Sequence, residues 1–237
     1  MKYNTRFNPT ITGALHIGHL YMALVNEFEA HRTGGKFYVR VDDTQPHWSF
    51  KIGKKRREKY YLEYREQLDL FLSVDGWHRQ SQMPKPKDII GKHPILKRYP
   101  RLFENGVDVE YQERFGRSLN GYNPEYIVRK IVWDFYEKTN WLIRGEELMA
   151  EANLYSHFVE EIGLPRVYQI YLPHLERKES GERVSKSAGT YGLAKQIDAF
   201  GIEGTLSRLR ESCLVDLEGE FVIDNIKRQP IVQGFIK

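Results

Sequence analysis

The sequence has one cysteine and no long hydrophobic run. The single thiol, Cys213, excludes an internal disulfide and a zinc site built from several cysteines. It continues an apolar helical stripe with Ile202, Leu206 and Leu209, so we predict a buried structural thiol. No apolar stretch is long enough to span a bilayer, and the first residues lack the basic-then-apolar pattern of a signal peptide. These absences favour a protein of the reducing cytoplasm with no membrane partner.

A strong net charge is also lacking. The chain has 36 Lys and Arg against 32 Asp and Glu, a formal charge of +4, which permits a nucleic-acid partner without predicting one. Two local basic clusters, over residues 51–59 and 92–101, are explained equally well as solvated surface or as phosphate-binding patches. The length of 237 residues fits one large domain or one domain with an insertion.

The most informative stretch is His16-Ile17-Gly18-His19. It follows a strand-like segment, 3–8, and a turn-rich segment, and it opens an amphipathic helix over 17–32. Glycine lets the backbone approach a ligand closely, and a helix start presents unpaired N–H groups to an anion. Two imidazoles add donors, so the stretch predicts a nucleotide-phosphate site. The alternative is that His16 is a helix cap and His19 a surface residue, because short motifs recur by chance.

A second motif lies in a polar loop over 182–190, after a strand-like run at 167–172. Lys186 supplies a mobile charge, while Ser185 and Ser187 supply hydroxyl donors. Such a loop can close over a polyphosphate and neutralise the charge that develops as pyrophosphate leaves. Alone it is explained more simply as a solvated loop, but its pairing with the first motif favours a catalytic role.

The two motifs, 16–19 and 183–187, resemble the signatures of class I aminoacyl-tRNA synthetases. The resemblance is more specific to the glutamyl-tRNA synthetase type, including the short glutamyl-queuosine tRNA(Asp) synthetases, in three further segments: 6–15, 34–44 and 141–148. The resemblance covers 3–48 and 122–195 and is weaker elsewhere. It implies an α/β fold with a Rossmann-like, nucleotide-binding parallel sheet and helices on both faces.

The resemblance also implies a domain plan. We expect a split catalytic domain over 1–73 and 122–195, a short acceptor-binding-type insertion over 74–121, a stem-contact-like helical extension over 196–237 and no anticodon-binding domain. Hydrophobic periodicity and turn residues predict helices at 17–32, 54–72, from 123–124 onward, 146–162 and 203–213, and strands at 3–8, 36–42, 141–144, 167–172 and 220–223.

The implied chemistry joins a carboxylate to the α-phosphate of ATP and expels pyrophosphate. A carboxylate is already a nucleophile, so the protein needs only to hold the anions in line and stabilise the extra charge of the transition state. We assign catalytic roles to His16, His19 and Lys186. Further ATP contacts fall to Gly18, Ser185 and Ser187, and the resemblance places Leu175 at the adenine. Mg²⁺ is expected with ATP as substrate, and no structural zinc is expected.

An acidic amino acid needs two sites for carboxylates and one for an ammonium group. Arg6 and Arg144, at strand ends, can bind carboxylates bidentately, and Asp42 can take the α-ammonium group. Tyr126 can donate a hydroxyl. The resemblance implies these same four positions and adds Glu147 near the ribose or substrate.

Each of these residues has a structural alternative. Arg144 and Glu147 can form a local ion pair, Asp42 can cap a turn, and Tyr126 can belong to the core. Asp42 also stands where bacterial glutamyl enzymes usually carry Glu and looks more like glutaminyl and archaeal-type glutamyl enzymes, whereas Arg144 favours glutamate.

The sequence therefore predicts a monomeric ligase that activates glutamate with ATP and transfers the glutamyl group to the acceptor end of tRNA. Three alternatives stay open: a glutamyl-queuosine tRNA(Asp) synthetase, a ligase with a non-tRNA acceptor such as a carrier protein or a small amine, and a non-catalytic tRNA-binding paralogue. The intact His16, His19 and Lys186 count against the last.

Overall fold

The computed structural model describes residues 1–44, 54–91, 124–177, 180–181, 183–184, 191–216, 219–231 and 235. The chain divides into two compact units. The first comprises Met1–Gln82, Ile143–Glu146 and Leu172–Lys237, and the second comprises Met83–Leu142 and Glu147–Tyr171.

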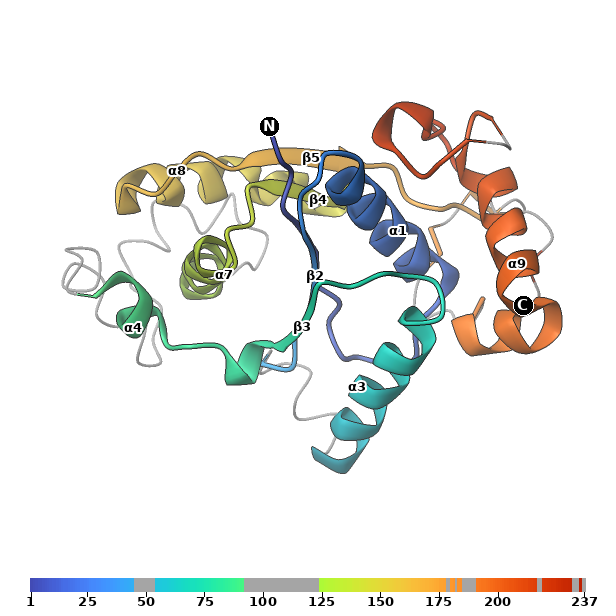
Figure 1. Ribbon diagram of the computed structural model, residues 1–237, viewed down its shortest axis with the longest axis horizontal. Helices are drawn as coiled ribbons and strands as arrows, with labels where there is room; N and C mark the ends of the chain where they lie inside the picture. The colour runs from blue at the N-terminus through green and yellow to red at the C-terminus, as the bar shows by residue number, and fades with distance from the viewer. Residues whose placement is uncertain are drawn as a thin grey trace. The chain divides into compact units, whose positions relative to one another are not determined.

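The first unit is built on a parallel sheet. Within the described residues, β1 (Thr5–Phe7), β2 (Phe37–Val41) and β3 (Gly76–Arg79) pair in the order β1-β2-β3, and both pairings are parallel (Figure 1). All of β1 and most of β2 is buried, as is usual for strands of parallel sheets. Since parallel strands end at the same edge, the residues that follow the three strands gather there, including Asp42 and Gln80.

Helix α1 (Ile17–Arg32) connects β1 to β2 and packs on both strands. The longer α9 (Leu193–Cys213) packs against α1 (Figure 1). Asn26 of α1 is fully buried: its carbonyl accepts from the Thr5 hydroxyl at 2.7 Å, and its amide donates to the carbonyl of Ile143 at 3.2 Å. Because Ile143 lies in β4 (Trp141–Gly145), this one residue ties the helix to two strands.

Helix α3 (Lys54–Leu68) holds the loop that follows β1. Its Tyr64 is fully buried, and the Tyr64 hydroxyl donates to the carbonyl of Gly13 at 2.5 Å and more weakly to that of Thr10 at 3.4 Å. Burial raises the pKa of the Tyr64 hydroxyl well above its ordinary value, so the group is a hydrogen-bond donor at any working pH.

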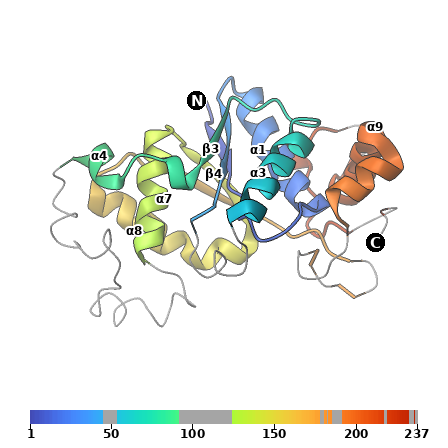
Figure 2. The same ribbon diagram turned by 90° about the horizontal axis from the view of Figure 1, so that it is seen from below.

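The second unit is mainly helical. It contains α4 (Pro86–Ile90), α7 (Pro124–Tyr136) and α8 (Ala152–Ile162), with α7 packed against both other helices (Figure 2). β4 pairs with β5 (Tyr168–Leu172), and the two units share both strands. Gly163 ends α8 in the left-handed conformation, with φ 72°, as its place before Pro165 predicts.

The helix at 17–32 and the strands near 36–42 and 141–144 are confirmed, but other predictions are wrong. No strand was expected at Gly76–Arg79, and the helix from 54 ends at Leu68. The predicted strand at 220–223 is not formed; a 3₁₀ turn spans Ile223–Asn225, because the Ile223 N–H donates to the Glu29 carboxylate at 2.8 Å instead of to a neighbouring strand.

Two helices also differ from expectation. α9 begins at Leu193, ten residues before the predicted start at 203, and bends at Gly201, whose φ of 66° breaks the apolar periodicity on which the prediction relied. On α7, Ile127, Val128, Ile131 and Val132 are buried as the pattern predicts, whereas Phe135 is 42% exposed.

Candidate active site

The two histidines form a capping box at the start of α1. His16 is the N-cap residue in an extended conformation, and its Nδ1 accepts from the N–H of Gly18 at 3.1 Å. His19 Nδ1 accepts from the His16 N–H at 3.1 Å, so two of the otherwise unsatisfied N–H groups of the helix start are bonded. The rings lie 3.8 Å apart between centroids and are tilted by 41°. The alternative that His16 is a helix cap is therefore correct. His19, for which the alternative was a surface residue, is half-buried and takes part in the same cap.

This capping arrangement fixes where each imidazole carries its proton. Both Nδ1 atoms accept hydrogen bonds and so present lone pairs. In the neutral ring the proton must then sit on Nε2. Each histidine is thus both a cap, through Nδ1, and a donor, through Nε2. Capping and anion binding are compatible roles, because they use different nitrogens.

Gly18 is required for close packing at this cap. A Cβ added to Gly18 would lie 3.0 Å from both Cε1 and Nδ1 of His16, and 4.0 Å from the carbonyl oxygen of Val184. The first motif therefore has room for the His16 ring only because residue 18 lacks a side chain. The same measurement places Val184, which directly precedes Ser185, beside the helix start.

Both flanks of the second motif meet the first. On one side, the buried Val184 donates its N–H to the carbonyl of Leu175 at 2.8 Å. On the other side, Ile17 donates to the Tyr191 carbonyl at 3.1 Å and Leu193 donates to the Leu15 carbonyl at 2.9 Å. Val184 and residues 191–193 thus lie beside the start of α1, some 170 residues away in the chain. Ser185, Lys186 and Ser187 lie outside the described residues.

The predicted ammonium site is a buried cluster at the ends of β2 and β3. Asp42 is 1% exposed, and its Oδ1 accepts from the N–H and the hydroxyl of Thr44, both at 3.1 Å, and from Nε2 of Gln80 at 2.5 Å. Its backbone pairs with the loop after β1 through Pro9 and Ile11. The turn-capping alternative is thus correct for Oδ1. Gln80 was not singled out from the sequence, because no local pattern signals a partner 38 residues away.

The two predicted carboxylate-binding arginines are both buried in strands of the first unit. Arg6 lies in β1 and is 4% exposed, and Arg144 lies in β4 and is 5% exposed. Buried guanidinium groups stay charged and require anionic or polar partners. Leu175 is buried in the same unit. Of the remaining predicted residues, Glu147 lies in the second unit and Tyr126 lies in α7, with its side chain outside the described part of the structure.

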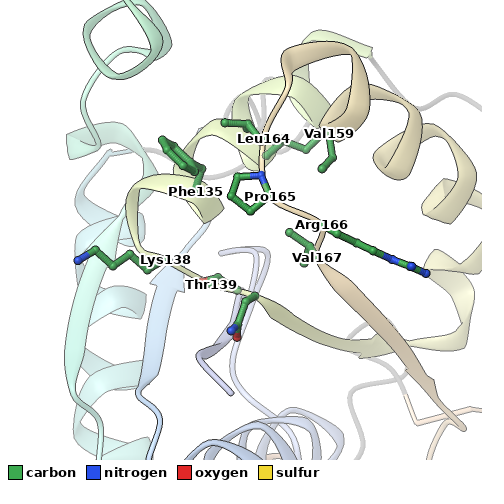
Figure 3. Close-up of a pocket in the computed structure, with 10 residues that line it drawn as sticks. Phe135, Lys138, Thr139, Val159, Leu164, Pro165, Arg166 and Val167 are labelled. Carbon is green, nitrogen blue, oxygen red and sulfur yellow. The ribbon is translucent and has the colours of Figure 1, made fainter. Parts of the chain in front are cut away.

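A separate cavity of about 180 Å³ lies in the second unit (Figure 3). Phe135 of α7, Val159 of α8 and Leu164 with Pro165 supply apolar walls, and Lys138 and Arg166 extend outward on either side. Apolar cavities of roughly 150 Å³ hold one small aromatic ring. No predicted site residue lines this cavity.

Among the described residues, no group of three or more His, Cys, Asp or Glu side chains is placed to hold a metal ion. No helix in that part of the chain is both long and apolar enough to cross a membrane.

Comparison with known proteins relates this geometry to a family. A sequence model of the family described as "tRNA synthetases class I (E and Q), catalytic domain" matches residues 2–83, the segment that contains the His16–His19 cap and the Asp42 cluster. The matched segment includes β1, α1, β2 and β3.

Curated relatives extend the likeness to the class I synthetases. Glutamate--tRNA ligase 1 of Ruegeria pomeroyi is 32% identical over 125 residues, which are 52% of this chain and 26% of that ligase. Glutamyl-Q tRNA(Asp) synthetase of Cupriavidus metallidurans is 23% identical over 267 residues, which are 86% of this chain and 84% of that protein. The chain therefore spans about a quarter of the first relative and most of the second.

Solved structures support the class I synthetase fold. Glutamate-tRNA synthetase from Elizabethkingia anophelis superposes with a TM-score of 0.56 at 19% identity, over 85% of this chain and 54% of that one. Tyrosyl-tRNA synthetase from Archaeoglobus fulgidus gives 0.60 at 16% identity, over 80% and 60%. At these identities the likeness establishes the fold alone, and it confirms the predicted α/β class with parallel strands.

Proposed function

We propose that the protein activates glutamate with ATP, forms glutamyl-adenylate and transfers the glutamyl group to tRNA. The observation that supports this most is the start of α1. There, two imidazoles with protons on Nε2, a close-packed glycine and both flanks of the Lys186 motif come together. Donors gathered at a helix start suit the triphosphate of a nucleotide.

In the proposed first step, a substrate carboxylate oxygen attacks the α-phosphorus of ATP. An O–P bond forms, the bond to the bridging oxygen breaks, and pyrophosphate leaves with the electron pair. His16 and His19 donate from Nε2 to phosphate oxygens, and Lys186, with Ser185 and Ser187, neutralises the charge on the departing group. Mg²⁺ would accompany ATP as part of the substrate and would supply positive charge to its phosphates.

Substrate selection in this proposal rests on buried charge. The guanidinium groups of Arg6 and Arg144 take the two carboxylates of glutamate, and Asp42 takes the ammonium group. Leu175 lines the adenine. Tyr126 and Glu147 complete the amino-acid and ribose contacts, as the resemblance implies.

A second candidate acceptor is favoured by one observation. The relatives that align over most of their own length are glutamyl-Q tRNA(Asp) synthetases, whereas the glutamate ligases align over a quarter or less. The proposed adenylate step is common to both. In the second candidate the glutamyl group goes to queuosine of tRNA(Asp) instead of the tRNA terminus.

We further propose that tRNA phosphates contact the first turns of α3, in the cytoplasm. Lys55, Arg56 and Lys59 are exposed there, and no acidic residue lies in the first turn. Four consecutive cations at a helix start oppose the helix dipole, so an anionic partner would relieve the repulsion. The predicted insertion of the acceptor-binding type includes residues 92–121, which lie outside the described residues.

Amino-acid-dependent exchange of pyrophosphate into ATP tests the proposal. With total tRNA present, we expect exchange with glutamate. Exchange with glutamine alone would refute the role of Arg144, and no exchange with any amino acid would refute the function. Charging of intact and queuosine-free tRNA then separates the two acceptors, because only the second candidate requires queuosine. Periodate destroys the diol of the tRNA terminus and that of queuosine, so periodate-oxidised tRNA should accept no glutamate in either case and serves as the blank.

A further inference from the structure

The side-chain oxygen of Gln80 has no hydrogen-bond partner among the described residues. It lies next to the predicted ammonium site at Asp42. Gln80 is the first residue after β3, at the edge of the sheet where β2 ends in Asp42. It is 1% exposed. Among the residues that the structure describes, none donates to its Oε1, which is itself shielded from solvent. Buried polar atoms are nearly always hydrogen-bonded, so this acceptor calls for a donor.

The chemistry of the cluster fixes which way the amide faces. Gln80 Nε2 lies 2.5 Å from Asp42 Oδ1 and 3.1 Å from the Thr44 hydroxyl, and so both of its hydrogens have acceptors. Exchanging the amide nitrogen and oxygen would place two acceptors 2.5 Å apart, which is repulsive. The oxygen therefore cannot satisfy itself by turning toward Asp42.

The missing donor must be small, because it has to reach the buried oxygen of Gln80 beside the carboxylate of Asp42. A primary ammonium group has three N–H donors and a positive charge, so it can bind a carboxylate and a neighbouring amide oxygen together. The predicted ammonium site assigns this charge to Asp42. The Asp42 oxygen that faces Gln80, Oδ1, already accepts from Thr44 and Gln80.

We propose that the side-chain carbonyl of Gln80 is a binding residue for the α-ammonium group of the amino-acid substrate. This inference rests on the proposed function, since it assumes an amino acid at the end of β2. Gln80 then has two tasks: its N–H groups orient Asp42, and its oxygen binds the substrate directly.

Direct binding of L-glutamate and of glutarate tests this. Glutarate has the same carbon chain and both carboxylates, but hydrogen replaces its ammonium group. We expect Gln80→Met to weaken glutamate binding about ten- to a hundredfold, as for the loss of a hydrogen bond to a charged group, and to leave the dissociation constant for glutarate within about twofold. Gln82→Met is the matched control, because Gln82 lies in the same 3₁₀ turn but is exposed; it should change neither constant.

Two results would overturn the proposal. An equal loss for glutamate and glutarate would mean that Gln80 only supports the fold of the site, and unchanged glutamate binding would mean that it has no role. If Gln80→Met does not fold by circular dichroism, Gln80→Asn keeps the amide but withdraws its oxygen by one methylene, and it should weaken the binding of glutamate more than that of glutarate; an equal effect on both would refute the idea. A wild-type protein that binds neither ligand would refute the proposed function together with this inference, whereas wild-type binding with an insensitive variant refutes this inference alone.

Discussion

Replacing Gly18 with alanine should separate activity from stability. The added Cβ would lie 3.0 Å from two atoms of the His16 ring, closer than ordinary van der Waals contact at 3.5–4.0 Å. The ring cannot yield freely, because its centroid lies 3.8 Å from that of the tilted His19 ring and its Nδ1 accepts from the N–H of residue 18 itself. We therefore expect the imidazole to shift by a few tenths of an ångström and the cap to weaken.

The effect on stability should be small because two contributions oppose each other. Loss of an N-cap costs about 1 kcal/mol, while exchanging glycine for alanine in a helix gains up to about 1 kcal/mol. For a chain of this size, the net change should move Tm by no more than about 4 °C. Catalytic geometry is less tolerant, since a misplacement of about 1 Å can cost roughly a hundredfold in rate.

We expect kcat/KM for ATP in the exchange assay to fall at least about tenfold, with Tm nearly unchanged. Gly13→Ala is the control: Gly13 lies in the loop before the motif, and a Cβ there meets no atom within 4 Å. Wild-type activity in Gly18→Ala would refute the view that the His16 ring is held in a required position. So would a loss of activity that follows the loss of folded protein.

Three further perturbations test other parts of the structure. Tyr64→Phe leaves the carbonyls of the loop after β1 without their buried donor, so Tm should fall by about 2–12 °C, for a cost of about 1–3 kcal/mol; an unchanged Tm in differential scanning calorimetry would contradict this. Burial raises the pKa of Glu27 in the folded protein above its unfolded value, so its contribution to stability is lost as pH rises through the folded pKa. The Tm of Glu27→Gln relative to wild type should therefore be higher at pH 7 than at pH 4. The same pH profile of Tm in both proteins would refute that sign. Val159→Ile adds one methylene to the wall of the cavity and should raise Tm by about 2–3 °C, for a gain of about 0.8 kcal/mol. Val132→Ile is the control, because Val132 lies in filled core, and it should lower Tm. The reverse order of the two Tm values would mean that the cavity does not accept the extra carbon.

The sequence predicts α1 and β2 well because their signals are local. The helix at α1 follows from its cap and its apolar spacing, and β2 follows from a buried apolar run that ends in acidic residues. β3 has no such signal: Gly76-Trp77-His78-Arg79 shows neither alternation nor β-branched residues, and it forms because β2 presents an unpaired edge. Tertiary pairing, not local preference, decides that strand.

The same distinction applies to the candidate site. His16, His19, Arg6, Asp42 and Arg144 could be named from motif and strand-end position alone. The hydrogen-bond partners of Asp42 could not, because Gln80 is brought to it by the register of β2 against β3. The capping function of both imidazoles also needed the structure, since a sequence motif does not show which nitrogen faces the backbone.

The pairing of residues 15–17 with 191–193 has a consequence for how the protein is made. A ribosome releases the chain from its N-terminus, so Leu15 and Ile17 emerge some 170 residues before their hydrogen-bond partners, Leu193 and Tyr191. Closing so long a loop comes late in folding, because its entropy must be offset by contacts already formed. The nascent chain would thus hold an incomplete candidate site until residues 191–193 emerge, and a chain that stalled before Tyr191 would keep the motif without these contacts.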